Sequence, residues 1–456
     1  MTLGFGTGLG HLIPLMLYLT AIIACLVSIF WKPHYGMYLL IPLLPLQTTR
    51  YKLFDFPMGN KLIDIILISV IIGLLLNGRS IIPKTSVNRP ILALAVVFYA
   101  ALWHGSFYLN RAMPLSIDDP RVSDFKNYMV MPLLFLVVVA TIRELKQIYV
   151  VVSVSVLSTI LVYVSYLLSM RGRDLSHFSY STRDAGVLGY AGENGFAAYV
   201  AQMVVLLFAL YAFQKNKSLR LILLGLNALG IYCLLFSYSR GAYLAFALGL
   251  GFMALFRERK ILVGLLVVVL GWQIFLPTAA SERIAMTYNK DTGLESSAQE
   301  RVQLWEDAWQ LFVGHPVFGI GLETYEYMDR VSAEGHGWLH DTHDYYLKVL
   351  AETGLVGLFI FLWLLFCILR EGWRLFCEAE EPFLKSLGLG FTALMVCAIV
   401  LNLFGDRWTY IQVDGILWAL LGCVVSGRAI CSRMREKEAE EEEEPVLATV
   451  TASPVS

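Results

Sequence analysis

Long apolar blocks recur along the chain and restrict its fold more than any other feature of the sequence. A helix needs roughly 20 mostly apolar residues to cross a bilayer. Blocks of about this kind lie at 11–31, 35–47, 61–77, 90–108, 127–142, 148–169, 194–213, 219–237, 241–256, 261–276, 354–370, 384–404 and 411–427. We therefore predict an all-α, polytopic integral membrane protein with about 12–13 transmembrane helices. The count depends on the second block, because Pro42 and Pro45 favour a tilted or re-entrant element there.

The composition excludes several other classes of protein. Charged residues make up only 16% of the chain, whereas a soluble domain carries about a quarter. A membrane barrel is excluded because the ~10-residue alternating segments that it requires are absent. The net charge of −1 and the lack of a basic, aromatic-rich cluster give no sign of nucleic-acid binding. The seven cysteines lie in the apolar blocks, near their ends or in segments placed in the cytoplasm, so we expect no disulfides.

Basic residues between the blocks set the expected orientation, because cytoplasmic loops are enriched in Lys and Arg. Alternate connections carry Arg79, Lys84 and Arg89; Arg143 and Lys146; Lys215, Lys217 and Arg220; Arg257, Arg259 and Lys260; Arg370, Arg374 and Lys385; and Arg428, Arg433 and Arg435. With these in the cytoplasm, we expect an N-terminal transmembrane bundle (1–276), one long external loop (277–342), C-terminal transmembrane helices (343–428) and a disordered acidic cytoplasmic tail (429–456).

The segments placed outside are nevertheless rich in arginine. They hold Arg50, Arg111, Arg121, Arg171, Arg173, Arg183, Arg240, Arg283, Arg301, Arg330 and Arg407. Any single one is explained by snorkelling to lipid headgroups, but as a set they indicate an external anionic ligand. Asp64, His104 and Asp414 also lie near the external ends of their blocks rather than at the bilayer midplane, where transporters place charged sites. We therefore expect the chemistry at the outer face.

Two outer motifs suit a phosphate ligand. Ser239-Arg240-Gly241 stands at the junction of two blocks, and a guanidinium can hold a phosphate through two donors at once. In the long loop, Arg301 and Trp305 are one helical turn apart, and an indole can stack on a sugar or anchor at the interface. The run Pro316-x2-Gly319-x-Gly321 predicts a turn rather than a phosphate-binding loop, because no Lys-Ser pair follows it.

His343 is the candidate general base, since an imidazole can accept a proton from an attacking hydroxyl near neutral pH. Alone, a histidine at a helix mouth is more often an interfacial residue, but its neighbours favour a function. A metal site of His340, His343 and Asp344 is an alternative. Zinc usually needs a third ligand and a supporting shell, for which only His336 and Asp341 remain. We predict no metal and no cofactor.

The order of these elements resembles the O-antigen ligase and O-antigen polymerase superfamily. The resemblance rests on Ser239 to Gly241, Arg301 to Gly321, His343-x3-Leu347-x4-Glu352-x-Gly354, and Arg183-x5-Gly189-x4-Asn194-x2-Ala197. It is firm over residues 190–370, and only the pattern of spans supports it before residue 170. Family members usually have asparagine or serine after the histidine, whereas this chain has Asp344. An acid in contact with His343 would stabilise its charged form.

The resemblance implies a glycosyltransferase of the bacterial inner membrane whose active site faces the periplasm. Such enzymes move a glycan from undecaprenyl diphosphate to an acceptor hydroxyl. The acceptor is lipid A-core or a protein for a ligase, and another lipid-linked glycan for a polymerase. His343 would be the catalytic base, and Arg240, Arg301 and Arg183 would contact the diphosphate. The supporting residues would be Asp344, Trp305, Asn194 and Glu352.

Three functions stay open at this point. The clear histidine motif favours a ligase over a polymerase. A transporter or flippase for lipid-linked sugars would also explain the spans and the arginines, but it predicts charges along a path through the whole membrane. Convergence of Arg240, Arg301 and His343 at the outer face would support transfer chemistry, and their dispersal would exclude it.

Overall fold

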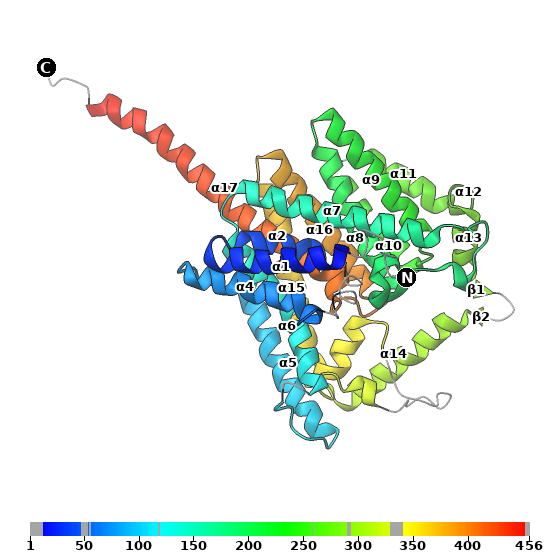
Figure 1. Ribbon diagram of the computed structural model, residues 1–456. Coiled ribbons are helices and arrows are strands. Elements are labelled where there is room, and N and C mark those ends of the chain that lie inside the picture. The colour runs from blue at the N-terminus through cyan, green and yellow to red at the C-terminus, as the bar shows by residue number, and fades with distance from the viewer. Residues whose placement is uncertain are drawn as a thin grey trace.

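The computed structural model describes residues 12–46, 53, 56–116, 119–257, 259–289, 293–328 and 341–451, and this part of the chain is almost entirely helical (Figure 1). The first eight helices are α1 (Leu12–Phe30), α2 (His34–Leu43), α4 (Leu62–Leu76), α5 (Asn88–Tyr108), α6 (Pro120–Thr141), α7 (Leu145–Met170), α8 (Gly192–Phe213) and α9 (Lys217–Leu235). They are followed by α10 (Arg240–Phe256), α11 (Arg259–Leu270), α12 (Trp272–Phe275), α13 (Thr278–Ala285), α14 (Ser296–Gly314), α15 (Tyr345–Glu378), α16 (Pro382–Leu401) and α17 (Ile411–Thr451). Short 3-10 turns are η2 (Gly59–Lys61), η3 (Tyr180–Thr182), η4 (Gly186–Ala191) and η5 (Tyr325–Tyr327), and β1 (Tyr288–Asn289) pairs antiparallel with β2 (Gly293–Leu294).

Each predicted apolar block coincides with a helix, and the predicted all-α membrane class is confirmed. In the described residues, ten helices are long and apolar enough to cross a membrane. This is fewer than the 12–13 predicted, because three of the expected spans are short. Helix α2 has 10 residues and contains Pro42, α10 has 17 residues, and α11 has 12 residues and stops at Gly271.

Helices α8, α16 and α17 form the centre of the bundle. In each, 78% of the most apolar window is buried inside the protein, against 17% for α1 and 22% for α9. Helices α1 and α9 therefore present most of their apolar surface outward, where lipid would cover it. The central position of α16 and α17 fixes the loop between them, which reaches the candidate site.

Helix α15 connects the two ends of the bundle. Its 34 residues correspond to a length of ~50 Å. At its far end, Arg428 of α17 pairs with Glu371 at 2.6 Å and with Glu378 at 2.9 Å, and Arg433 donates to the carbonyl of Arg143 at 3.0 Å. Basic residues that the sequence places on one side of the membrane thus gather at one end of the protein.

Two predicted boundaries are wrong. Helix α15 begins at Tyr345, not at 354, so the histidine motif opens the same helix, and the predicted start coincides with a non-helical kink at Gly354 (φ 65°). The tail is not disordered from residue 429, because α17 continues through the glutamate run to Thr451 and projects from the bundle (Figure 1). Ala, Glu, Lys and Arg dominate this segment up to residue 444, and they are strong helix formers.

Candidate active site

The glycine motifs build a clamp between the end of α14 and α15. Backbone N–H groups of Ile320 and Gly321 donate to the carbonyls of Ala351 and Glu352 at 2.9 and 2.8 Å. Gly319 has a φ of 67°, a conformation that favours glycine, and His104 lies 3.1 Å from its carbonyl oxygen. The predicted turn is confirmed, and it holds α14 against the helix that follows His343.

A methyl group at Gly319 is expected to break this clamp. In Gly319→Ala, the new Cβ would lie 2.5 Å from the Ala351 oxygen, and φ would stay at +67°. We expect a loss of at least ~2 kcal/mol of stability, seen as a lower melting temperature of the purified protein in detergent. Gly314→Ala is the matched control, because no neighbouring atom lies within 4 Å of its Cβ position. Equal melting of both variants would contradict the role of the clamp.

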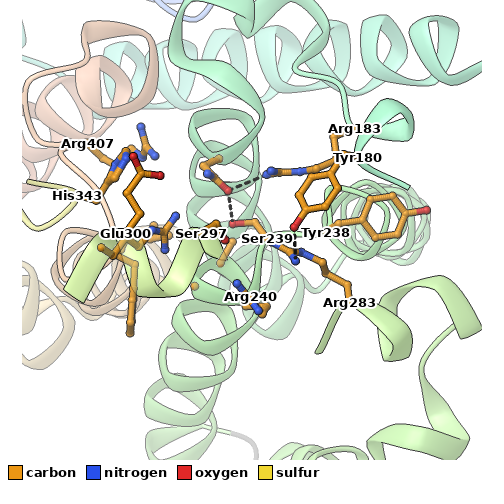
Figure 2. A pocket seen from close by; sticks show the side chains of 16 residues that line it. Tyr180, Arg183, Tyr238, Ser239, Arg240, Arg283, Ser297, Glu300, His343 and Arg407 are labelled. Carbon is orange, nitrogen blue, oxygen red and sulfur yellow. Dashed lines mark hydrogen bonds between the residues drawn. The ribbon is translucent and has the colours of Figure 1, made fainter. Parts of the chain in front are cut away.

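The predicted site residues Arg183, Arg240, Arg301, His343 and Asn194 line one pocket of about 180 Å³ (Figure 2). They come from the loop before α8, the start of α8, the start of α10, α14, and the loop that enters α15. Figure 2 shows Arg183 and Arg283 on one side of the pocket and His343 and Arg407 on the other. Arg240, Arg301 and His343 therefore converge, as transfer chemistry requires.

Asn194 orders the wall formed by α8 and α10. Its side-chain oxygen accepts hydrogen bonds from Arg183 at 2.9 Å and from the Ser239 hydroxyl at 3.0 Å (Figure 2). Gly241 is in close contact with Phe404, since a Cβ there would lie 3.0 Å from the Phe404 Cβ. The small size of Gly241 thus allows the loop after α16 to approach the pocket.

Glu295 anchors two further arginines of the wall. It pairs with Arg240 at 2.8 Å and with Arg283 at 2.6 Å, and it accepts a hydrogen bond from Tyr180. Burial raises the pKa of Glu295, but these three donors outweigh it and lower the pKa to about 2. The sequence analysis missed Glu295 because no motif includes it. It included Arg283 only as one of the external arginines.

His343 is held by Asp341, not by Asp344 as the sequence suggested. The His343 Nδ1 lies 3.2 Å from the Asp341 carboxylate, and the His343 backbone N–H donates to the same side chain at 2.9 Å. Asp344 instead caps α15, accepting from the backbone N–H groups of Tyr346 and Leu347. Burial raises the pKa of Asp341, but the adjacent His343 lowers it to about 2. This contact places the Nδ1 edge of the His343 ring against the Asp341 carboxylate.

Two other predicted supporting residues, Trp305 and Glu352, lie outside the pocket lining, as does Asp344. Trp305 is one turn from Arg301 on α14, as predicted, but does not face the pocket with it. Glu352 is buried and accepts from the backbone N–H of Tyr325 at 3.3 Å, so it supports the clamp. Of the alternative metal ligands, His336 and His340 lie outside the described residues.

Comparison with known families agrees with the sequence motifs. The O-antigen ligase family model matches residues 225–362, which include Arg240, Arg301 and His343. The predicted resemblance to the O-antigen ligase superfamily is thereby confirmed. A search of curated proteins gives no match. Arg183 and Arg407 lie outside the matched residues, although both line the same pocket.

Proposed function

We propose that this membrane protein is an O-antigen ligase-like glycosyltransferase, which moves a glycan from undecaprenyl diphosphate to an acceptor hydroxyl on lipid A-core or a protein. The observation that carries the proposal is the meeting of Arg183, Arg240, Arg301 and His343 in one pocket. Arginine guanidinium groups suit a diphosphate, and a histidine with one nitrogen held by a carboxylate suits a general base.

In the proposed reaction, Nε2 of His343 accepts the proton of the acceptor hydroxyl as its oxygen attacks the anomeric carbon of the donor sugar. The bond between that carbon and the diphosphate oxygen breaks, and the oxygen takes the bonding electrons. The arginines stabilise the negative charge that develops on the leaving diphosphate. The products are the glycosylated acceptor, undecaprenyl diphosphate and the proton now on His343, which passes to solvent.

We further propose that the protein lies in the bacterial inner membrane with this pocket facing the periplasm. The support is that basic residues gather at the other end of α15, around Arg428, Arg433 and Arg143, where the positive-inside rule puts the cytoplasm.

The test mixes purified protein with lipid-linked glycan and a candidate acceptor, and resolves the products by size. A single shift of the acceptor supports a ligase. A ladder formed from the donor alone would replace this proposal with the polymerase. No product under any condition, with movement of the donor across vesicles, would replace it with the flippase.

Asp341 is expected to act as a positioning residue for His343. Asp341→Asn should lower kcat by about 100-fold, within the 10²–10⁴ that general-base catalysis contributes, with little change in donor KM. Rates at several pH values should separate this from a folding defect. Because the folded pKa of about 2 is below the ordinary 3.8, the Asp341 carboxylate stabilises the fold above about pH 4 and loses this effect as pH falls towards ~2.

Between about pH 5 and 8 Asp341 thus stays ionised, and any titration seen there in the wild-type rate comes from another group. Asp344→Asn, which keeps the helix cap, is the matched control and should retain activity. A larger loss in Asp344→Asn than in Asp341→Asn would reverse the assignment.

A further inference from the structure

We propose that Arg407 is a further binding residue for the diphosphate, and that it forms with Arg301 a two-arginine clamp beside His343. This inference rests on the proposed function and extends it to a residue outside the family-matched segment. It concerns the loop between α16 and α17, which carries none of the sequence motifs.

The arginines of the pocket differ in their ion-pair and hydrogen-bond partners. Arg240 and Arg283 share the Glu295 carboxylate, and Arg183 donates to Asn194. Within the described part of the chain, the side chains of Arg301 and Arg407 form no ion pair and no hydrogen bond to an acceptor. The pocket therefore holds two guanidinium groups whose N–H donors have no acceptor among the residues described here. An anionic ligand requires such donors.

Arg407 is buried as well as uncompensated, with only 7% of its surface exposed. The ring centroid of Tyr410 lies 5.7 Å from its guanidinium carbon. Asp414 of α17 interacts electrostatically with Arg407, but the hydrogen bond that its carboxylate accepts comes from Gln202, at 2.9 Å. A buried guanidinium without a direct partner is costly, so its presence at a pocket wall points to a ligand.

Two contacts fix the loop to the histidine segment, and a third orders the loop itself. The side-chain oxygen of Asn402 accepts from the backbone N–H of Arg407 at 3.0 Å, and the Asn402 carbonyl accepts from the N–H of Tyr345 at 2.9 Å. Lys348 of α15 pairs with Asp406, next to Arg407, at 3.1 Å. Asn402 thus joins Arg407 to the residue two places after His343. Both Arg407 and His343 line the pocket, and Figure 2 shows them on the same side of it.

The electrostatics of Arg301 agree with this arrangement. Burial lowers the pKa of Arg301, and the nearby Arg407, Arg240, Arg283 and Arg183 lower it further, with Arg407 the strongest of the four. Arg301 and Arg407 thus repel each other. A diphosphate between them would relieve this repulsion, and a diphosphate diester carries two negative charges for two guanidinium groups.

The test measures binding of undecaprenyl diphosphate to purified protein in detergent by calorimetry, with inorganic diphosphate as a second probe. We expect Arg407→Ala and Arg407→Gln to raise Kd by about 10- to 100-fold, the range for a charge-assisted hydrogen-bond pair, and Arg407→Lys to fall between. Arg171→Gln is the control, because Arg171 is exposed and outside the pocket. If the Arg407 variants bind both probes more weakly, Arg407 contacts the diphosphate itself. If they bind only the lipid more weakly, the proposed two-arginine clamp is overturned.

The same variants are assayed for transfer, so that failure of this inference differs from failure of the proposed function. Wild-type affinity and transfer in Arg407→Ala, with both lost in Arg301→Ala, would remove Arg407 from the site and leave the proposed function standing. Full transfer in each of the three single variants, Arg407→Ala, Arg301→Ala and His343→Ala, would overturn the proposed function itself. If the alanine variant does not fold, Arg407→Lys with a wild-type melting temperature decides: unchanged Kd overturns a bidentate contact.

Discussion

The His343→Ala variant is expected to insert into the membrane normally and to form no glycan product above background. The ring is replaced by a methyl group, so no group remains at this place to accept the proton of the acceptor hydroxyl. General-base catalysis contributes about 10²–10⁴ in rate, and we expect a fall in kcat at the upper end of that range. Product formation is measured with lipid-linked donor and acceptor both saturating, so that the change reports on chemistry rather than on binding.

His177→Ala is the control for this variant. His177 is an exposed histidine that pairs with Glu282 at 2.7 Å, outside the pocket lining, so its removal should leave transfer unchanged. The donor Kd of His343→Ala should also stay near wild type, because the arginine walls remain. A fully active His343→Ala would remove the histidine from the mechanism, and the pocket would then be a binding site whose catalytic base lies elsewhere.

The strained backbone of His343 supports the expectation that this residue acts in function. Its φ of 53° is unusual for a residue with a side chain. Non-glycine residues in this conformation cost roughly 1–3 kcal/mol and collect at functional sites. The preceding Asp341 holds the turn through both the backbone N–H and the ring of His343. The fold thus stabilises this conformation through the same residue that orients the imidazole.

The fold could be predicted because the length of an apolar block is a local property of the sequence. Each block lies on a helix, and the motif boundary at Gly354 coincides with a real kink. Whether a short helix crosses the membrane is not local. It depends on packing, as the 12-residue α11 and the proline-containing α2 show. The tail was misjudged because its charge suggested solvation, whereas its helix propensity extends α17.

The convergence of Arg183, Arg240, Arg301 and His343 could also be anticipated, because alternating spans bring the ends of distant helices to one face. The partners of these residues could not. Glu295 reaches Arg240 only through the conformation of the hairpin and α13, and Arg407 reaches the pocket through Asn402. Such contacts depend on loop geometry between residues far apart in sequence, and a single sequence does not encode them in any recognisable spacing.

The second large effect is expected at Arg301, in the wall that carries the uncompensated charge. Arg301→Ala should lower kcat/KM by about 100- to 1,000-fold, as for the loss of one donor to a developing negative charge. Arg301→Lys should recover only part of this, because an ammonium keeps the charge but cannot hold two oxygens in one plane. Both are measured as initial rates over a range of donor concentrations, which separates kcat from KM.

Arg111→Gln is the matched control, since Arg111 stacks on Tyr327 at 4.0 Å and does not line the pocket. The Arg301→Lys variant distinguishes a requirement for bidentate geometry from a requirement for charge alone. A loss in Arg301→Lys as large as that in Arg301→Ala would mean that bidentate geometry is required. Near-complete recovery would mean that Arg301 acts only through its charge, as a screen for the diphosphate. Wild-type kinetics in Arg301→Ala would contradict both accounts, because Arg301 would then have no part in the reaction.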